Sequence, residues 1–200
     1  MYGMSDSGNC YKVRLALEQL AAPYRWVEID TGRGDTRTPQ FRAMNPNGKV
    51  PTLGLEDGGF LPESNAILHY LADGSPLLPA GRLERARVLQ WMFFEQYSHE
   101  PYIAVARFWK HFFTKLTPQQ EIELPGRMEK GYAALGVMEQ HLAHHLFFVD
   151  ERFGLADIAL YGYTHCAGEG GFNLDNFPQV NAWLARVAAQ PGHVTIEHKN

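Results

Sequence analysis

The chain has 200 residues, of which 45% are hydrophobic and 12% aromatic, and this content excludes a disordered tail or a linker. Its formal charge of −4, with acidic and basic residues interspersed, argues against nucleic acid as a partner, because phosphate binding needs a basic face. No apolar run reaches the ~18 residues of a membrane span, so we expect no membrane partner. Cys10 and Cys166 cannot form a disulfide scaffold and do not pair with histidines at metal-ligand spacing, so we expect a reducing, cytoplasmic location and no metal.

Short segments of strand and helix character alternate over the first 75 residues. Apolar and polar residues alternate over 24–29 as in a half-buried strand, and Asp57-Gly58 is a hairpin-turn pair between two strand candidates. The expected strands are 1–3, 24–29, 50–55 and 59–61, the expected helices are 9–20 and 65–72, and 31–37 is expected to be a loop. This order of elements predicts a small α/β domain over residues 1–75.

The composition changes after residue 75. Residues 76–81 contain two prolines and a glycine, which is typical of a linker. Beyond the linker, helical patterns predict an all-helical bundle over residues 82–200. The expected helices are 83–115, with a kink at Pro101, then 118–145, 155–166 and 180–190.

The first chemical signal is Ser7-Gly8-Asn9-Cys10, between the first strand and the first helix. Ser7 and Cys10 stand where a thioredoxin-like redox protein has its Cys-x-x-Cys pair, and serine at the first position excludes a dithiol cycle within one chain. The Ser7 hydroxyl can instead donate to the thiolate of a ligand, which contributes roughly 1.5–3 kcal/mol, and the helix N-terminus adds roughly 0.3–1 kcal/mol. Lowering a thiol pKa by about two units requires about 2.7 kcal/mol, so these contributions suffice. An ordinary helix cap at Ser7 and a small buried residue at Cys10 are the alternatives.

The second signal is Val50-Pro51, inside the stretch 45–53. A proline that opens a strand belongs at a sheet edge or after a cis peptide bond. A cis bond would turn the backbone N–H and C=O of Val50 towards solvent, where an extended peptide could pair with them as an added strand. A plain turn into an edge strand is the alternative.

The third signal is Glu63-Ser64, at the start of the expected helix 65–72. Ser64 and the helix N-terminus could hold a ligand carboxylate, while Glu63 accepts from a ligand ammonium. An amino-acid headgroup carries both charges, and a γ-glutamyl group fits this description. Helix capping is the alternative.

These segments, in this order and spacing, resemble the N-terminal, thioredoxin-like domain of soluble glutathione transferases. The resemblance implies a catalytic role for Ser7, at the position of the serine that activates the glutathione thiol in the serine-type classes. Cys10 stands where one bacterial class has a cysteine, and it is the second catalytic candidate.

The resemblance also implies that glutathione is the co-substrate and that its ends are bound. Val50 and Pro51 match the cis-proline segment, Glu63 and Ser64 match the γ-glutamyl pocket, and Lys49 is a partner for the glycine carboxylate. Transferases of this family are typically homodimers, and a cytoplasmic role in detoxification is expected.

The second half of the chain extends the resemblance. Gly154-Leu155-Ala156-Asp157 is similar to the capping motif of the family's helical domain, where serine or threonine normally occupies the position of Gly154. The resemblance implies that this domain holds a small hydrophobic electrophile. The candidate substrate-binding residues are Arg107, which could orient an acidic group, Phe108, Trp109, Phe112 and Tyr163, although such an aromatic stripe is also typical of a bundle interior.

Two other functions remain open at this point. One is a glutathione-dependent disulfide reductase or isomerase that uses Cys10, and the other is a non-catalytic binding or scaffold protein of the same fold. The exposure of Cys10 separates the first of these from a transferase, because an exposed Cys10 favours redox chemistry and a buried Cys10 favours transfer.

Overall fold

The computed structural model describes residues 1–198 and divides the chain into two compact units. One unit comprises Met1–Leu78 together with the chain from Pro191 onward, and the other comprises Pro79–Gln190. The first is a thioredoxin-like domain and the second is helical, which confirms the predicted fold class. The segment from Pro191, which the sequence analysis assigned to the helical domain, clusters with the first unit.

A four-stranded sheet in the order β2-β1-β3-β4 forms the centre of the first unit. Its strands are β1 (Tyr2–Gly3), β2 (Val27–Glu28), β3 (Thr52–Gly54) and β4 (Phe60–Pro62). β1 runs parallel to β2 and antiparallel to β3, and β3 and β4 form the predicted hairpin. The expected strand 24–29 is therefore only two residues long, because alternation of apolar residues continues beyond the part that finds a partner strand.

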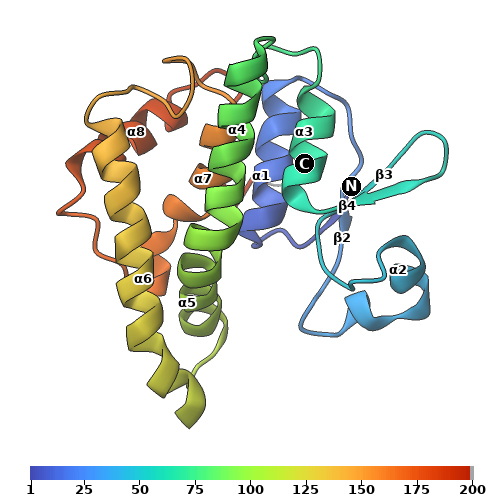
Figure 1. The fold of residues 1–200 in the computed structure, drawn as a ribbon. Helices are drawn as coiled ribbons and strands as arrows, with labels where there is room; N and C mark the ends of the chain where they lie inside the picture. The colour runs from blue at the N-terminus through green and yellow to red at the C-terminus, as the bar shows by residue number, and fades with distance from the viewer. Residues whose placement is uncertain (199–200) are drawn as a thin grey trace. The chain divides into compact units, whose positions relative to one another are not determined.

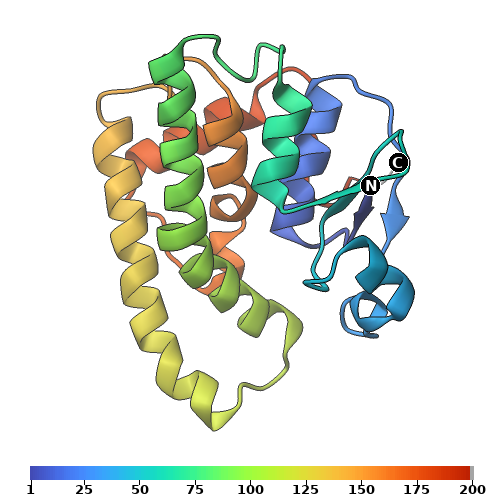
Figure 2. The same ribbon diagram turned by 45° about the vertical axis from the view of Figure 1, so that its right-hand side comes forward.

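Helices α1 (Gly8–Gln19) and α3 (Ser64–Ala72) lie side by side against the sheet (Figures 1 and 2). The buried core beneath them includes side chains from both helices, from β3 and from the residue before β1: Met1, Val13, Leu17, Leu53 and Ile67. The helix α2 (Pro39–Met44) was not predicted. Its only local signal is Thr38-Pro39, a capping threonine followed by a proline in the first turn, because six residues are too few to show a helical period.

The segment from Pro191 is hydrogen-bonded to α1. The Tyr11 hydroxyl donates to the carbonyl of Val194 at 2.7 Å, and the Arg14 guanidinium donates to the carbonyl of Ile196 at 2.5 Å. Both side chains on α1 are buried, so these bonds satisfy polar groups that would be costly to leave unpaired. This explains why the end of the described chain belongs to the first unit.

The second unit is built from helices. They are α4 (Arg82–Phe94), α5 (Glu100–Phe112), α6 (Pro118–Leu142), α7 (Leu155–Thr164) and α8 (Pro178–Ala188), with a short 3-10 turn η3 (Ala167–Gly170) after α7. The expected helix 83–115 is interrupted by a π-helical segment, η2 (Glu95–His99), and ends at Phe112. Pro101 lies in the first turn of α5, where its missing N–H costs little, so the irregularity precedes the expected kink.

The capping motif at the start of α7 is half complete. The Asp157 carboxylate accepts from the N–H of Gly154 at 3.0 Å, from Phe148 N at 3.3 Å and from the Trp183 indole at 2.8 Å. The second hydrogen bond of a capping box, from the backbone N–H of Asp157 to a side chain at position 154, is missing because Gly154 has no side chain, as the sequence predicted. Burial raises the pKa of Asp157 to about 7, and the three donors oppose this rise.

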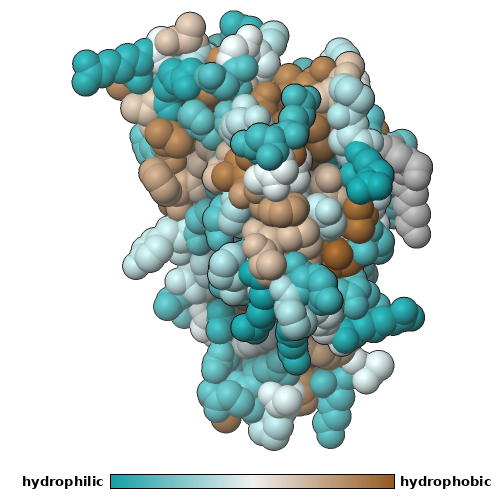
Figure 3. Space-filling model, turned by 90° about the vertical axis from the view of Figure 1, so that its right-hand side faces the viewer, coloured by the Kyte–Doolittle hydropathy of each residue, from teal (hydrophilic) through white to brown (hydrophobic). Residues whose placement is uncertain are grey.

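On the face shown in Figure 3, hydrophobic side chains occur in separate patches among hydrophilic ones. In the part of the chain that the structure describes, no helix is long and apolar enough to cross a membrane.

Candidate active site

Ser7 lies at the junction of a short loop and α1, as the sequence predicted. It is the N-cap residue, with extended backbone angles, and its side chain accepts from the N–H of Cys10 at 3.4 Å. Its own N–H donates to the carbonyl of Met4 at 3.0 Å. Ser7 is half-buried at the positive end of a helix of 12 residues, a position where negative charge is stabilised. The capping role and the expected catalytic role are therefore compatible at this residue.

The loop before Ser7 is held to the end of β2. The Glu28 carboxylate accepts from the Ser5 N–H at 2.8 Å and from the Ser5 hydroxyl at 2.6 Å. The Trp26 indole donates to the same carboxylate at 2.7 Å. Several bonds to one charged acceptor restrict the loop and so position Ser7.

Cys10 is fully buried, with no exposed side-chain area. Burial raises the pKa of its thiol to about 11, although hydrogen bonds from the Ser7 side chain and the Met4 N–H lower it. A thiol with this pKa is almost entirely protonated at neutral pH and therefore unreactive. By the criterion stated above, burial of Cys10 favours transfer over redox chemistry at this residue.

Ser64 is connected to α1 by a buried polar network. The Ser64 hydroxyl donates to the side-chain oxygen of Asn9 at 3.1 Å, and the Lys12 ammonium donates to the same oxygen at 2.8 Å. Ser64 and Lys12 are both buried. The network places a buried cation and a hydroxyl near the first turn of α3, a helix of nine residues whose N-terminus favours a carboxylate. Asn9 thus connects the segment of Ser7 with the segment of Ser64.

Glu63 precedes α3 and has φ 72°, in the left-handed region that non-glycine residues rarely adopt. Its side chain is exposed, as is that of Lys49, whereas Val50 is half-buried. The Val50–Pro51 peptide bond is cis, and Pro51 itself is buried. The Lys49 carbonyl accepts from the Asn45 amide at 2.7 Å, which holds the chain just before Val50.

The residues expected to bind a second substrate all lie in the second unit, and their exposure differs. Phe108 is 45% exposed and Phe112 is half-buried, while Tyr163 is only 8% exposed. The Arg127 guanidinium lies 4.8 Å from the ring centre of Trp109 and so covers part of it. Phe108 is thus the most accessible of the expected aromatic residues.

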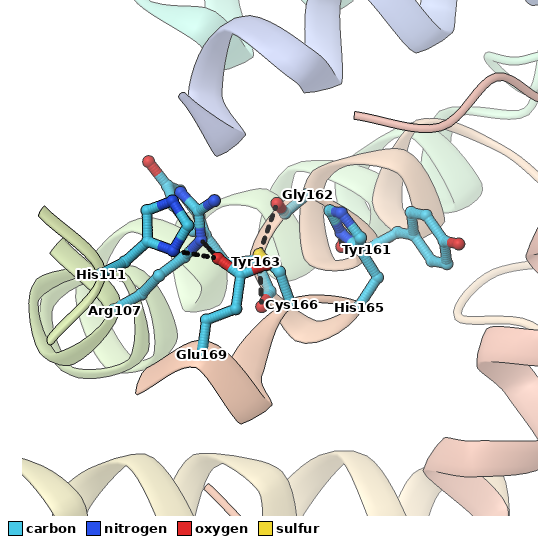
Figure 4. A network of polar contacts seen from close by, with 8 residues as sticks. All are labelled: Arg107, His111, Tyr161, Gly162, Tyr163, His165, Cys166 and Glu169. Carbon is cyan, nitrogen blue, oxygen red and sulfur yellow. Dashed lines mark hydrogen bonds and ion pairs between the residues drawn. The ribbon is translucent and has the colours of Figure 1, made fainter. Parts of the chain in front are cut away.

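Arg107 does not present an open cation. It is 2% exposed, and its Nε donates to the Glu169 carboxylate at 2.7 Å. His111 Nδ1 lies 3.0 Å from the same carboxylate oxygen. Figure 4 shows Arg107 and His111 on α5 directed towards Glu169 on η3, while Cys166 points to the carbonyls of Gly162 and Tyr163. The acidic group that Arg107 contacts here belongs to the chain itself.

Sequence reasoning missed Asn9, Lys12 and Glu169. Asn9 and Lys12 are three residues apart on α1, a spacing that places them on one helix face and could have drawn attention to them. Glu169 had no local signal, because its partner Arg107 is 62 positions away in the chain. Among residues 1–198, no group of three or more His, Cys, Asp or Glu side chains is placed to hold a metal ion.

Comparison with known proteins identifies the family of both units. Residues 1–78 match the family model for the glutathione S-transferase N-terminal domain, and residues 91–191 match the model for the C-terminal domain. The crystal structure of a glutathione S-transferase from Pseudomonas fluorescens is 52% identical, with a TM-score of 0.96 and 98% of each chain covered. Glutathione S-transferase 4 of Zea mays is 33% identical, over 96% of this chain and 88% of that protein. The chain therefore belongs to the glutathione S-transferase family.

A further relative has a different name. The disulfide-bond oxidoreductase YfcG of Escherichia coli is 29% identical, over 92% of this chain and 87% of that protein. Relatives of this chain thus have more than one named activity, and the particular reaction has to be argued from the site.

Proposed function

We propose that this protein is a glutathione transferase in which the Ser7 hydroxyl stabilises the glutathione thiolate for attack on a small hydrophobic electrophile. The observation that carries the proposal is the contrast between Ser7 and Cys10. Ser7 is half-buried at the N-terminus of α1, whereas Cys10 is fully buried with its thiol pKa raised to about 11. Ser7 is therefore the more accessible of the two residues.

The first unit has a polar group suited to each charged end of glutathione, which supports the proposal. The buried Ser64 hydroxyl at the first turn of α3, supported by Asn9 and Lys12, suits the carboxylate of a γ-glutamyl group. The exposed carboxylate of Glu63 suits the ammonium of the same group, and the exposed Lys49 ammonium suits the glycine carboxylate. Bound in this way, glutathione supplies the thiol, and Ser7 supplies the hydrogen bond that favours its ionised form.

The test is a glutathione titration of the wild-type protein, a Ser7→Ala variant and a Cys10→Ala variant, with heat and thiolate absorbance followed together. A hydrogen bond to a charged group contributes roughly 1.5–3 kcal/mol, so Ser7→Ala should raise the bound thiol pKa by about one to two units. Binding should persist, and Cys10→Ala should keep the wild-type thiolate signal.

Each unfavourable result has a distinct meaning. Absence of glutathione binding to the wild-type protein would refute the transferase function and leave a binding or scaffold role. Loss of the thiolate signal in Cys10→Ala, with the signal kept in Ser7→Ala, would instead assign the chemistry to Cys10.

The second candidate function is a glutathione-dependent disulfide oxidoreductase, which the name of the relative YfcG supports. Its use of Cys10 is disfavoured by the burial of that residue. Formation of a mixed disulfide between Cys10 and oxidised glutathione, detected by the mass of the intact native protein, would favour this second function.

We also propose a cytoplasmic homodimer with a role in detoxification. Cys10 and Cys166 are both buried and neither is in a disulfide, which suits a reducing compartment. Leu89, Phe93 and Tyr97 are spaced by four residues along α4 and η2 and are 38%, 69% and 84% exposed. An exposed apolar stripe of this kind suits contact with a second copy of the chain, and sedimentation of the purified protein tests this.

A further inference from the structure

We propose that Glu169 makes the second-substrate surface select neutral aromatic electrophiles and reject anionic ones. The inference rests on the proposed transferase function, since it concerns the second substrate of the same reaction. It assigns a specificity role to a residue on η3 that the sequence did not indicate.

The first observation is the orientation of charge in the Arg107–Glu169 pair. The Arg107 side chain is 3% exposed and the Glu169 side chain is 36% exposed, with 2.7 Å between Nε and Oε2. The positive end of the pair therefore lies inside the protein, and the negative end faces solvent. His111, 35% exposed, adds a hydrogen-bond partner at 3.0 Å from the same oxygen. An approaching molecule meets a carboxylate and not a guanidinium.

The second observation is the group of aromatic rings at the end of α5. Phe108 lies 5.3 Å from Phe112 and 5.2 Å from Phe113, measured between ring centres, and Phe108 and Phe113 are 45% and 43% exposed. Phe112 is 4.8 Å from the His111 ring and 5.9 Å from the Arg107 guanidinium carbon. Phe112 thus lies beside both Arg107 and His111, the two residues that contact the Glu169 carboxylate, so the rings and the carboxylate are linked at the same end of α5. Flat apolar surface attracts an aromatic substrate, and the carboxylate next to it repels an anionic substituent.

Removal of the Glu169 charge has a predictable direction. A Glu169→Gln substitution keeps the size of the side chain and leaves the buried Arg107 charge without its carboxylate, so the local field becomes positive. An anionic substrate should then be attracted where it was repelled. For charges about 6 Å apart, Coulomb's law gives about a threefold gain in relative affinity in water and about a hundredfold gain at an effective dielectric constant of about 20. Because the Glu169 side chain is partly exposed to water, we expect a gain towards the lower end, of about fivefold to tenfold. Lys110, which packs against Gly171, keeps its charge in both proteins. Its effect on the binding of an anionic substrate is therefore the same in the wild type and in Glu169→Gln.

The experiment compares two electrophiles that differ by one carboxylate: 1-chloro-2,6-dinitrobenzene and 4-chloro-3,5-dinitrobenzoate. In both, the glutathione thiolate attacks the carbon that bears chlorine, a C–S bond forms, the C–Cl bond breaks and chloride leaves. The measured quantity is the kcat/KM of the benzoate divided by that of the neutral compound. Glu169→Gln should raise this ratio by about fivefold to tenfold. Glu129→Gln, an exposed glutamate on α6 with the same change in net charge, should leave the ratio within about twofold of the wild type.

A binding measurement keeps the inference testable if no conjugation is observed. The unreactive compounds 1,3-dinitrobenzene and 3,5-dinitrobenzoate are titrated into the three proteins, and the ratio of their dissociation constants should shift in Glu169→Gln alone. In the wild-type protein, high salt should weaken the discrimination because it screens the carboxylate. This arm needs no variant, so it remains valid if Glu169→Gln does not fold.

The outcomes separate the two ideas. Failure of conjugation with a shifted binding ratio would refute the transferase function and retain the role of Glu169. Equal ratios in the wild type and Glu169→Gln, or a discrimination that salt does not change, would overturn the role of Glu169 whatever the activity.

Discussion

Two glycines of α6 offer a test of how well the packing of the second unit is understood. Replacing either Gly131 or Gly136 by alanine adds the same methyl group to the same helix. A Cβ at Gly131 would lie 2.5 Å from two ring carbons of Phe172 and 3.3 Å from the side chain of Ile103. A Cβ at Gly136 would have no atom within 4 Å outside its immediate neighbours and the helix backbone.

The two substitutions should change the free energy of unfolding in opposite directions. Alanine in a helix interior is favoured over glycine by about 1 kcal/mol, so Gly136→Ala should stabilise by up to about 1 kcal/mol. Gly131→Ala has the same gain, but the Phe172 ring is 3% exposed and packs edge-on against Tyr132, so it cannot move away freely. Overpacking of this kind costs about 1–3 kcal/mol, and more for so close a contact, which makes Gly131→Ala a net loss of about 1–2 kcal/mol.

Urea unfolding of the wild type and both variants, followed by circular dichroism, measures these changes. If Gly131→Ala is as stable as Gly136→Ala, the Phe172 ring does not pack closely against Gly131 and the reasoning is refuted. The double variant Gly131→Ala/Phe172→Leu provides a further check, because removing the ring should recover part of the loss.

Two further predictions follow from buried titratable groups. Cys10 should not react with an aromatic disulfide reagent in the native protein at pH 8, because the thiol is buried and burial raises its pKa to about 11. It should react once urea unfolds the chain, and rapid reaction of Cys10 in the native protein would contradict its burial. Burial raises the pKa of Asp157 to about 7, so above about pH 4 the native protein binds a proton that the unfolded chain has released. The wild type should therefore lose up to about 2.6 kcal/mol of stability between pH 5 and pH 8 that Asp157→Asn does not lose. Parallel slopes of urea midpoint against pH in the two proteins would refute this.

Local sequence was sufficient for most of the elements. The expected helices 9–20, 65–72 and 118–145 lie within a few residues of α1, α3 and α6, because apolar spacing and caps depend on neighbours along the chain. The Thr117 cap of α6 forms a full capping box with Gln120, an interaction contained within four residues. The interruption at η2 was not predictable, since it depends on packing around Glu95 and His99, both fully buried.

The candidate site was only partly accessible from the sequence. The positions of Ser7 and Ser64 at helix starts were predicted from the residues around them. Their connection through Asn9 was not, because Ser64 and Asn9 are 55 positions apart and meet only when α3 packs beside α1. Likewise, the aromatic residues of α5 were recognised, but not which of them are exposed.

The sequence by itself determined the division into an α/β and a helical part, the family resemblance and the two helix starts that carry Ser7 and Ser64. These depend on backbone hydrogen bonding and side-chain spacing within a few residues. Only the tertiary structure decided that Cys10 is inaccessible and that the charge of Arg107 is taken up by Glu169. The availability of a thiol or a charge depends on which distant groups remove its water and supply its partner, and that information exists only once the chain has folded.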